Sequence, residues 1–298
     1  MPGPRSRFRS RLHEQRLIAA PGAYDALTAL LVERAGFEAV YLTGSGVAYT
    51  HLGAPDLGLV TETEMRDRLW QITDRVDLPV IADADTGYGG LLNVGRTVRD
   101  YERAGAAALQ IEDQTFPKRC GHYANKSVVP IEEMLARVRA ALDARVDPDL
   151  QIIGRTDALA TSGFDVALER ANLMVAEGVD VAFVEAPTDA AQLARIPAAV
   201  SAPVLVNIVE GGRTPNVPLD QLEQWGYRIA IFPNMITRTV VRAAQTALDG
   251  LRRDGRSRVD AERMVDFDEL SALVGLPEAT RLEERLTHPD RSHRVRGR

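Results

Sequence analysis

Residues 80–112 read VIADADTGYGGLLNVGRTVRDYERAGAAALQIE and contain a complete strand–helix–strand unit. The runs Val80–Asp83 and Ala108–Glu112 are almost continuously apolar, which is typical of parallel strands buried on both faces. Between them, Leu92–Ala104 carries apolar side chains at helical spacing, and Gly105 follows where a helix would end. Two buried strands joined by one helix form the βαβ unit of α/β proteins.

The same rhythm continues on both sides of this unit. Glycines also close the helical segments Tyr24–Ala35 and Val166–Glu177, at Gly36 and Gly178. The predicted strands are Leu17–Ala20, Ala39–Thr43, Val80–Asp83, Ala108–Glu112, Gln151–Arg155, Val181–Glu185, Val204–Asn207 and Arg228–Phe232. Eight parallel strands, each followed by a helix, close into a barrel. The sequence therefore predicts the α/β class and a (β/α)8 TIM-type barrel.

Helical patterns continue after the last predicted strand, at Ile236–Arg253, Asp266–Val274 and Glu278–Leu286. A bare barrel does not need this material, so we expect it to pack on a neighbouring subunit. No repeat or low-complexity linker interrupts the chain, which predicts a single domain. Its expected parts are the barrel at about residues 15–253, a C-terminal helical extension at about 254–290 and a basic tail at 291–298.

Composition limits the partners of this chain. Its 298 residues carry a net charge of −6, with 45% hydrophobic and 26% charged side chains. We expect no nucleic-acid partner, because phosphate recognition depends on clustered Lys and Arg. No apolar run approaches the roughly 18 residues of a membrane span. The single cysteine cannot form an intrachain disulfide, so we expect the reducing cytoplasm; an organellar transit peptide in the Arg-rich residues 1–11 is the alternative.

Polar side chains gather where the predicted strands end. In barrels of this kind the active residues come from these carboxyl ends, which share one rim. The residues at such positions are Thr43, Gly44, Ser45, Asp83, Asp85, Glu112, Arg155, Glu185 and Asn207. One polar residue at a strand end could be a turn residue or a helix cap. Convergence from most of the strands instead indicates an active site.

Three carboxylates crowd one part of this rim. Asp83 and Asp85 follow one strand and Glu112 ends the next, and like charges in one pocket repel unless a cation lies between them. Oxygen ligands without a nearby histidine favour Mg²⁺, or Mn²⁺, over zinc. The alternative is a structural ion network in which Arg155 and Lys118 neutralise the acids. We predict a Mg²⁺ site with open positions for substrate oxygens.

The only cysteine lies in a cationic loop after the fourth strand, Lys118-Arg119-Cys120-Gly121-His122. Cationic neighbours lower a thiol pKa from about 8.5 towards neutrality, and a group with such a pKa can give or take a proton. The alternative for a lone cysteine is a small buried apolar side chain. Asn125 and Lys126 extend the polar character of the loop, as expected of a mobile lid.

Together these motifs resemble those of the isocitrate lyase and phosphoenolpyruvate mutase superfamily, and the likeness covers nearly the whole chain. It begins at Pro21-Gly22-Ala23-Tyr24-Asp25. Its most specific pieces are Asp83-Ala84-Asp85-Thr86-Gly87-Tyr88-Gly89, Glu112-Asp113-Gln114, the loop from Lys118 to His122, and Arg155-Thr156-Asp157-Ala158. The loop is similar to that of the lyase branch, because phosphoenolpyruvate mutase itself lacks the cysteine. The resemblance implies a homotetramer in which the eighth helix is exchanged between subunits.

The resemblance also implies roles for individual residues. Asp83 would bind Mg²⁺ directly, with Asp85 and Glu112 acting largely through water, and Cys120 would be the catalytic acid. The residues that would contact substrate are Thr43, Gly44, Ser45, Arg155, Glu185 and Asn207, to which we add Gly121 and His122 of the cysteine loop. Asp56 would lie near the substrate.

Two segments bear on the substrate, a small-molecule carboxylate. Arg238 falls where the similar 2-methylisocitrate lyases carry an arginine for a substrate carboxylate, although their Pro-Leu-Ser is here Pro233-Asn234-Met235. Residues 210–215 look more like carboxyphosphonoenolpyruvate mutases and dicarboxylate lyases. We predict a Mg²⁺-dependent carbon–carbon lyase that cleaves a 2-hydroxy tri- or dicarboxylate, first of all 2-methylisocitrate to pyruvate and succinate.

The chemistry of such a cleavage assigns the remaining tasks. A base must take the hydroxyl proton, and Tyr41, Asp56 or a metal-bound hydroxide could serve. Arg155 and Arg238 would clamp carboxylates with their planar guanidinium groups. The alternative functions are a carboxyphosphonoenolpyruvate mutase-like P–C bond enzyme, a dicarboxylate lyase of the 2,3-dimethylmalate or oxaloacetate type, and a barrel that only binds a dicarboxylate.

Overall fold

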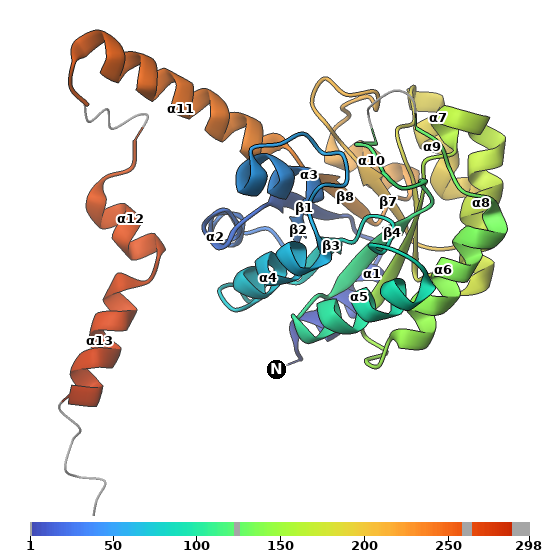
Figure 1. Ribbon diagram of the computed structural model, residues 1–298, viewed down its shortest axis with the longest axis horizontal. Helices are drawn as coiled ribbons and strands as arrows, with labels where there is room; N and C mark the ends of the chain where they lie inside the picture. Colours follow the sequence, from blue (N-terminus) through green and yellow to red (C-terminus); the bar gives the residue numbers. More distant parts are fainter. Residues whose placement is uncertain (1, 122–125, 258–263, 288–298) are drawn as a thin grey trace, which may run out of the picture. The chain divides into compact units, whose positions relative to one another are not determined.

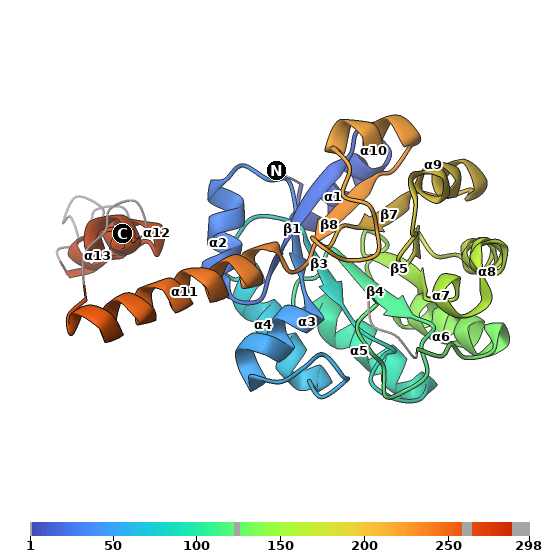
Figure 2. The same ribbon diagram turned by 90° about the horizontal axis from the view of Figure 1, so that it is seen from above.

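A computed structural model describes residues 2–121, 126–257 and 264–287 of the chain. The chain divides between Thr239 and Val240 into two compact units, a barrel unit and a C-terminal unit. Figures 1 and 2 show the barrel unit from two directions, with its strands enclosed by helices.

The eight predicted strands form one closed barrel in sequence order, and every neighbouring pair is parallel, which confirms the predicted fold. The strands are β1 (Ile18–Ala23), β2 (Val40–Leu42), β3 (Val80–Asp83), β4 (Ala108–Glu112), β5 (Gln151–Thr156), β6 (Val181–Val184), β7 (Val204–Asn207) and β8 (Ile229–Phe232). Pairing of Ile18 with Ile229 and of Pro21 with Phe232 joins the first strand to the last. All eight carboxyl ends therefore meet at one rim.

Helices alternate with the strands around the barrel. The longer ones are α2 (Ala26–Arg34), α4 (Glu62–Thr73), α5 (Leu91–Arg103), α6 (Ile131–Ala144), α8 (Phe164–Glu177), α9 (Ala190–Ala199) and α10 (Leu219–Trp225). Their ends follow local chemistry: Asp25 caps α2 by accepting from the Thr28 amide at 2.8 Å. After α5 and α8 the chain turns through Gly105 (φ 95°) and Gly178 (φ 120°), a backbone conformation that favours glycine. Short helices α3 (Gly44–Val47), η1 (Ala48–Leu52) and α7 (Leu159–Ser162) lie beyond the strand ends.

An N-terminal helix that the sequence did not predict, α1 (Pro4–Leu12), packs on the barrel interior. Phe8 and Leu12 are buried in the same apolar cluster as inward-facing side chains of several strands. Arg5 donates to the backbone carbonyl of Ala106 at 2.6 Å, just before β4, so α1 covers the amino-terminal mouth of the barrel. The opposite mouth is left for the site.

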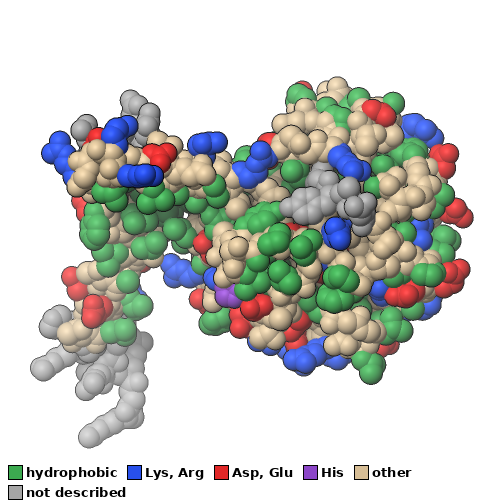
Figure 3. Space-filling view, turned by 45° about the horizontal axis from the view of Figure 1, so that its top comes forward, with side chains coloured by type: hydrophobic (Ala, Val, Ile, Leu, Met, Phe, Trp, Pro, Cys, Tyr) green, Lys and Arg blue, Asp and Glu red, His purple; other side chains and the backbone are tan. Residues whose placement is uncertain are grey.

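The C-terminal unit comprises most of α11 (Met235–Asp254) together with α12 (Phe267–Leu273) and α13 (Leu276–Thr287), close to where helices were expected. Neither α12 nor α13 has a buried residue, and apolar side chains gather on the surface of this unit (Figure 3). Phe267 is 82% exposed and Leu286 is 70% exposed. Packing of these helices on a neighbouring subunit stays a prediction. In the described part of the chain, no helix has the length and apolar character needed to cross a membrane.

Candidate active site

A small cavity lies at the rim where the strands end. Its volume is about 30 Å³, room for roughly two water molecules. It is lined by Tyr41, Thr43, Ser45, Asp56, Asp83, Lys118, Arg119, Cys120, Gly121, Arg155, Asn207, Val209, Pro233 and Asn234. The predicted acid, one predicted metal ligand and the predicted carboxylate-binding arginine therefore face one space.

The turn after β2 brings backbone close to the acidic cluster. Thr43 caps α3 by accepting from the Gly46 amide at 3.2 Å, and its hydroxyl lies 3.1 Å from that of Ser45. A Cβ atom added to Gly44 would lie 2.6 Å from Asp83 Oδ2, so only glycine allows this approach. The turn after β2 thus places backbone and hydroxyl groups beside the Asp83 carboxylate.

A buried lysine bridges two of the acids. Lys118 Nζ lies 2.5 Å from Asp56 Oδ1 and 2.7 Å from Asp85 Oδ1, with all three side chains nearly inaccessible to solvent. Burial alone would lower the pKa of Lys118, but Asp85 and Asp56 raise it well above its usual value. The lysine is therefore a fixed positive charge at the cavity wall.

Asp85 and Glu112 are buried carboxylates with raised pKa values. Burial, opposed by Lys118 and reinforced by Asp83, raises the pKa of Asp85 to about 7. Burial likewise raises the pKa of Glu112 well above its ordinary range, against the effect of Arg155, which lies 3.2 Å from Glu112 Oε2. The ion pairs of the alternative structural network, Lys118 with Asp85 and Arg155 with Glu112, are thus both present.

This donor set still fits a divalent cation. Glu112 Oε1 is buried and has no hydrogen-bond partner among the described residues, and Asp83 faces the cavity without an ion pair in that part of the chain. The described residues hold no ready-made cluster of three or more metal-ligating side chains. Mg²⁺ needs none, because it usually takes one or two carboxylates and keeps several waters.

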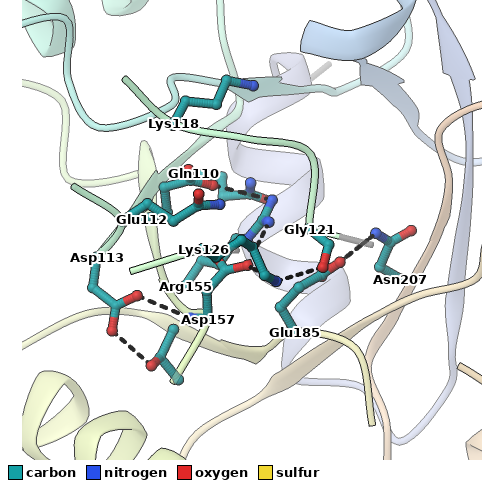
Figure 4. Close-up of polar contacts among 12 residues, drawn as sticks. Gln110, Glu112, Asp113, Lys118, Gly121, Lys126, Arg155, Asp157, Glu185 and Asn207 are labelled. Atoms are coloured by element: carbon teal, nitrogen blue, oxygen red, sulfur yellow. Dashed lines mark hydrogen bonds and ion pairs between the residues drawn. The ribbon is translucent and has the colours of Figure 1, made fainter. Parts of the chain in front are cut away.

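Arg155 is the central cation of the site (Figure 4). Its guanidinium donates to Asp157 through Nε at 2.8 Å and through Nη2 at 3.1 Å, and it lies 5.3 Å from the centre of the Phe183 ring. Burial opposes its charge, but Asp157 and Glu112 raise its pKa well above the usual value. A permanently charged planar group at the cavity wall suits carboxylate binding.

Tyr41 and Gln110 connect the barrel interior to the acids. The Tyr41 hydroxyl donates to Gln110 Oε1 at 3.4 Å, and Gln110 Nε2 donates to Asp83 Oδ1 at the same distance. Burial, with Asp83, raises the pKa of Tyr41 well above its usual value. Gln110 was missed by the sequence analysis because it lies inside β4 rather than at its end.

Glu185 and Asn207 approach the loop that carries the cysteine. Asn207 Nδ2 donates to Glu185 Oε1 at 3.2 Å (Figure 4). A Cβ atom on Gly121 would collide with Glu185 Oε1 and with the Arg155 guanidinium, so the backbone of the loop lies directly against both side chains. The structure thus brings Glu185, Asn207 and Gly121 together.

The cysteine loop is held from one side by Gln114. Its amide accepts from the Arg119 N–H at 3.0 Å and donates to the Arg119 carbonyl at 2.8 Å. Cys120 is half-buried and lines the cavity, unlike a fully buried small apolar residue. His122 and Asn125, which the sequence analysis assigned to the site and its lid, lie outside the described residues.

Arg238 is not brought to the cavity. Its side chain is 59% exposed, lies 3.9 Å from Glu210 Oε2, and donates to the Glu210 carbonyl. Asn234 takes a place there instead, since it lines the cavity and accepts from the Ser45 hydroxyl at 3.1 Å. Asn234 follows β8, so the strand-end rule applied to the last strand would have found it.

Comparison with known proteins identifies relatives of this chain. A family described as "Phosphoenolpyruvate phosphomutase" matches residues 8–252. The chain is 43% identical to 2,3-dimethylmalate lyase of Eubacterium barkeri, covering 93% of this chain and 96% of that one. It is 42% identical to 2-methylisocitrate lyase of Aeropyrum pernix, covering 90% and 86%.

Solved structures of related enzymes superpose closely on this chain. Oxaloacetate acetylhydrolase in complex with 3,3-difluorooxalacetate superposes with a TM-score of 0.92 at 35% identity, covering 97% of this chain and 100% of that one. Phosphonopyruvate hydrolase in complex with oxalate and Mg²⁺ superposes with a TM-score of 0.86 at 30% identity, covering 96% and 100%.

Proposed function

The chain belongs to the phosphoenolpyruvate phosphomutase family, within the isocitrate lyase superfamily, and we propose that it is a Mg²⁺-dependent carbon–carbon lyase that releases a 2-keto acid from a 2-hydroxy di- or tricarboxylate. The observation that carries the proposal is the shared cavity. Asp83, Arg155 and Cys120 all line it. They would supply a metal ligand, a hydrogen-bond donor to a substrate carboxylate and a general acid, respectively. A phosphonate mutase would not need the cysteine.

Substrate binding falls to Arg155 and its neighbours. The guanidinium would bind a substrate carboxylate, since it keeps its charge and presents planar donors. The hydroxyls of Thr43 and Ser45 and the amide of Asn207 line the same cavity and can bind further substrate oxygens. The cysteine loop contributes Arg119, Cys120 and Gly121 to the same lining, so a bound substrate would lie against it.

The hydroxyl proton needs an acceptor in the cavity. Tyr41 is a poor one, because its raised pKa means that the phenol holds its proton. Asp56 lines the cavity and is ion-paired with Lys118, so we assign the base to Asp56. Lys118 would hold the Asp56 carboxylate in place as an anion before it takes up the proton.

Asp83 would hold Mg²⁺ directly, with Asp85 and Glu112 behind it, because Asp83 lines the cavity and the other two carboxylates do not. When bound, the ion supplies positive charge for the oxygen atoms that become negative during cleavage. The raised pKa values of Asp85 and Glu112 express the same lack of positive charge, since burial and neighbouring carboxylates cause them.

Cys120 would protonate the carbanion that leaves. Cleavage of the C2–C3 bond of 2,3-dimethylmalate sends the bond electrons to C3, and one proton from the thiol completes propionate beside pyruvate. With 2-methylisocitrate the same step gives succinate and pyruvate. The exposed position of Arg238 favours the dicarboxylate, because the arginine expected to bind a third carboxylate does not line the cavity.

A substrate panel tests the proposal. Purified protein with Mg²⁺ should release pyruvate from 2,3-dimethylmalate faster than from 2-methylisocitrate, as followed by a coupled dehydrogenase assay. Rearrangement of a phosphonopyruvate-type substrate without any keto acid release from the hydroxy acids would favour the mutase. Oxaloacetate belongs in the same panel, because its cleavage to oxalate would identify a hydrolase instead.

A further inference from the structure

Asp157 is a buried carboxylate that the proposed chemistry does not use. It follows β5, has no solvent exposure, and accepts both hydrogen bonds from Arg155 described above. Burial would raise its pKa, but Arg155 and Lys126 outweigh burial and hold the pKa at about 2. Asp157 is therefore an anion that fixes the plane of the substrate-binding guanidinium.

Lys126, which follows the cysteine loop in the sequence, contacts the same carboxylate. Its side chain is 1% exposed, and Nζ lies 2.5 Å from Asp157 Oδ1. The same ammonium donates to the carbonyl oxygen of Gly121, the residue after Cys120 (Figure 4). One charged group thus joins the cysteine segment to the anion that orients Arg155.

Asp157 is itself held from behind by Asp113 of the segment after β4. Asp113 Oδ1 accepts from the Asp157 amide at 2.9 Å, and Oδ2 accepts from the Thr156 hydroxyl at 2.7 Å and from Arg170 Nε at 2.8 Å. Asp113 is fully buried. The Asp157 carboxylate therefore has a fixed position set by β4, β5 and α8.

From these contacts we propose that Lys126 and Asp157 are positioning residues that hold Cys120 and Arg155 in one fixed relative geometry. The proposal rests on the proposed function only for the roles of Cys120 and Arg155. A buried ion network gives little net stability for its cost, so we attribute to this network a role in specifying geometry. Small displacements matter at such a site, because a misplacement of about 1 Å can lower a rate about 100-fold.

Kinetics of two variants test this coupling. Lys126→Met should lower kcat about tenfold or more while KM changes less than about threefold, since Arg155 keeps its carboxylate. Asp157→Asn should lower kcat and also raise KM, because Arg155 loses its charged partner. The double variant should be no worse than Asp157→Asn alone, because both changes act through one carboxylate. Independent, multiplying effects would overturn the proposal.

Ser127→Ala is the matched control. Ser127 is the next residue along, is exposed, and its hydroxyl lies 2.5 Å from that of Thr115, so its loss perturbs the same segment without touching the network. This variant should keep the wild-type kcat. Lys126→Arg retains charge and donor groups and should recover part of the lost kcat, which a merely space-filling lysine would not show.

Alkylation of the only cysteine gives a readout that needs no turnover. Iodoacetamide should label Cys120 several-fold faster in Lys126→Met than in wild type or Ser127→Ala, because the Gly121 carbonyl has lost its anchor. If wild type releases no keto acid from any hydroxy acid, the proposed function fails while labelling still decides the positioning role. Wild-type labelling rates in a folded Lys126→Met protein, with an unchanged kcat, would refute that role.

Discussion

At the scale of single residues, the site balances buried carboxylates against a few fixed cations. Lys118 is shared between Asp56 and Asp85, and Arg155 is shared between Glu112 and Asp157. Since the carboxylates outnumber these cations at the rim, their protonation and the binding of Mg²⁺ are linked.

Cys120 is the proposed catalytic acid. Cys120→Ser should lower kcat by about 10²–10⁴-fold, because a serine hydroxyl is a far weaker acid than a thiol. Mg²⁺ and product binding should change little, since the replacement is nearly isosteric. In the wild type, kcat should also decline at alkaline pH as the thiol ionises. The measurement is a pH–rate profile of both proteins. A variant that keeps the wild-type kcat and the same decline at alkaline pH would favour the alternative function, a P–C bond mutase.

Arg238→Leu separates the substrate classes. With a 2-hydroxy dicarboxylate, kcat/KM should stay within about threefold of wild type, because Arg238 lies outside the cavity and pairs with Glu210. With 2-methylisocitrate, a loss of about 10-fold or more is expected if Arg238 turns inward to a third carboxylate. Equal losses on both substrates would show that Arg238 is structural or binds a carboxylate common to both.

Asp85 makes the stability of the metal-free protein depend on pH. Its folded pKa is about 7, above the ordinary 3.8, so the folded state binds the proton more tightly than the unfolded state. The free energy of unfolding should therefore fall as pH rises from about 4 to 7. Asp85→Asn should be more stable than wild type by about 1–2 kcal/mol at pH 8 in EDTA, and no more stable at pH 4.

Urea unfolding at both pH values measures this difference. Mg²⁺ should reduce the advantage of Asp85→Asn, because the ion stabilises the wild-type cluster and not the amide. A variant that is less stable than wild type at pH 8 in EDTA would mean that the Lys118 pair outweighs the repulsion.

Residues at strand ends were predictable, whereas the residues that position them were not. Asp83, Arg155 and Asn207 follow from the position of each strand in the barrel. Gln110 lies within a strand, and Lys126 meets Asp157 across 31 positions of sequence. Such contacts depend on three-dimensional packing, which periodicity does not encode.

At the scale of elements, the strands were the easiest to predict because each is buried on both faces. The observed β3, β4 and β7 have the predicted bounds, while β2 ends at Leu42 because Thr43 already caps α3. Helix α1 was missed because its residues 4–12, PRSRFRSRL, carry only two buried apolar side chains, Phe8 and Leu12. Its arginines bind backbone and acids across the barrel mouth, as Arg5 does with Ala106 and Asp147.

Helix α1 should therefore contribute to barrel stability. Phe8→Ala should lower the free energy of unfolding by about 3 kcal/mol, because a buried aromatic ring is removed from the barrel interior. Arg9→Ala, which removes only the exposed ion pair with Asp149, should cost less than about 1 kcal/mol. Chemical denaturation compares the two, and equal effects would mean that α1 is held by charge rather than by packing.

At the scale of the whole molecule, the C-terminal helices α12 and α13 contain no buried residue. The family resemblance predicts a homotetramer in which the eighth helix is exchanged, and the apolar surface of α12 and α13 agrees with burial in an assembly. Light scattering should give a mass four times that of the chain. Full activity in a monomer would show that the active site does not depend on assembly.

We propose that this chain breaks a carbon–carbon bond with the help of Mg²⁺ held by Asp83. Pyruvate release from 2,3-dimethylmalate or 2-methylisocitrate tests it directly, measured with Mg²⁺, with excess EDTA, and for Asp83→Ala. Turnover is expected only in the wild type with Mg²⁺, and circular dichroism should show Asp83→Ala to be folded. Full turnover in excess EDTA, or by Asp83→Ala, would contradict it.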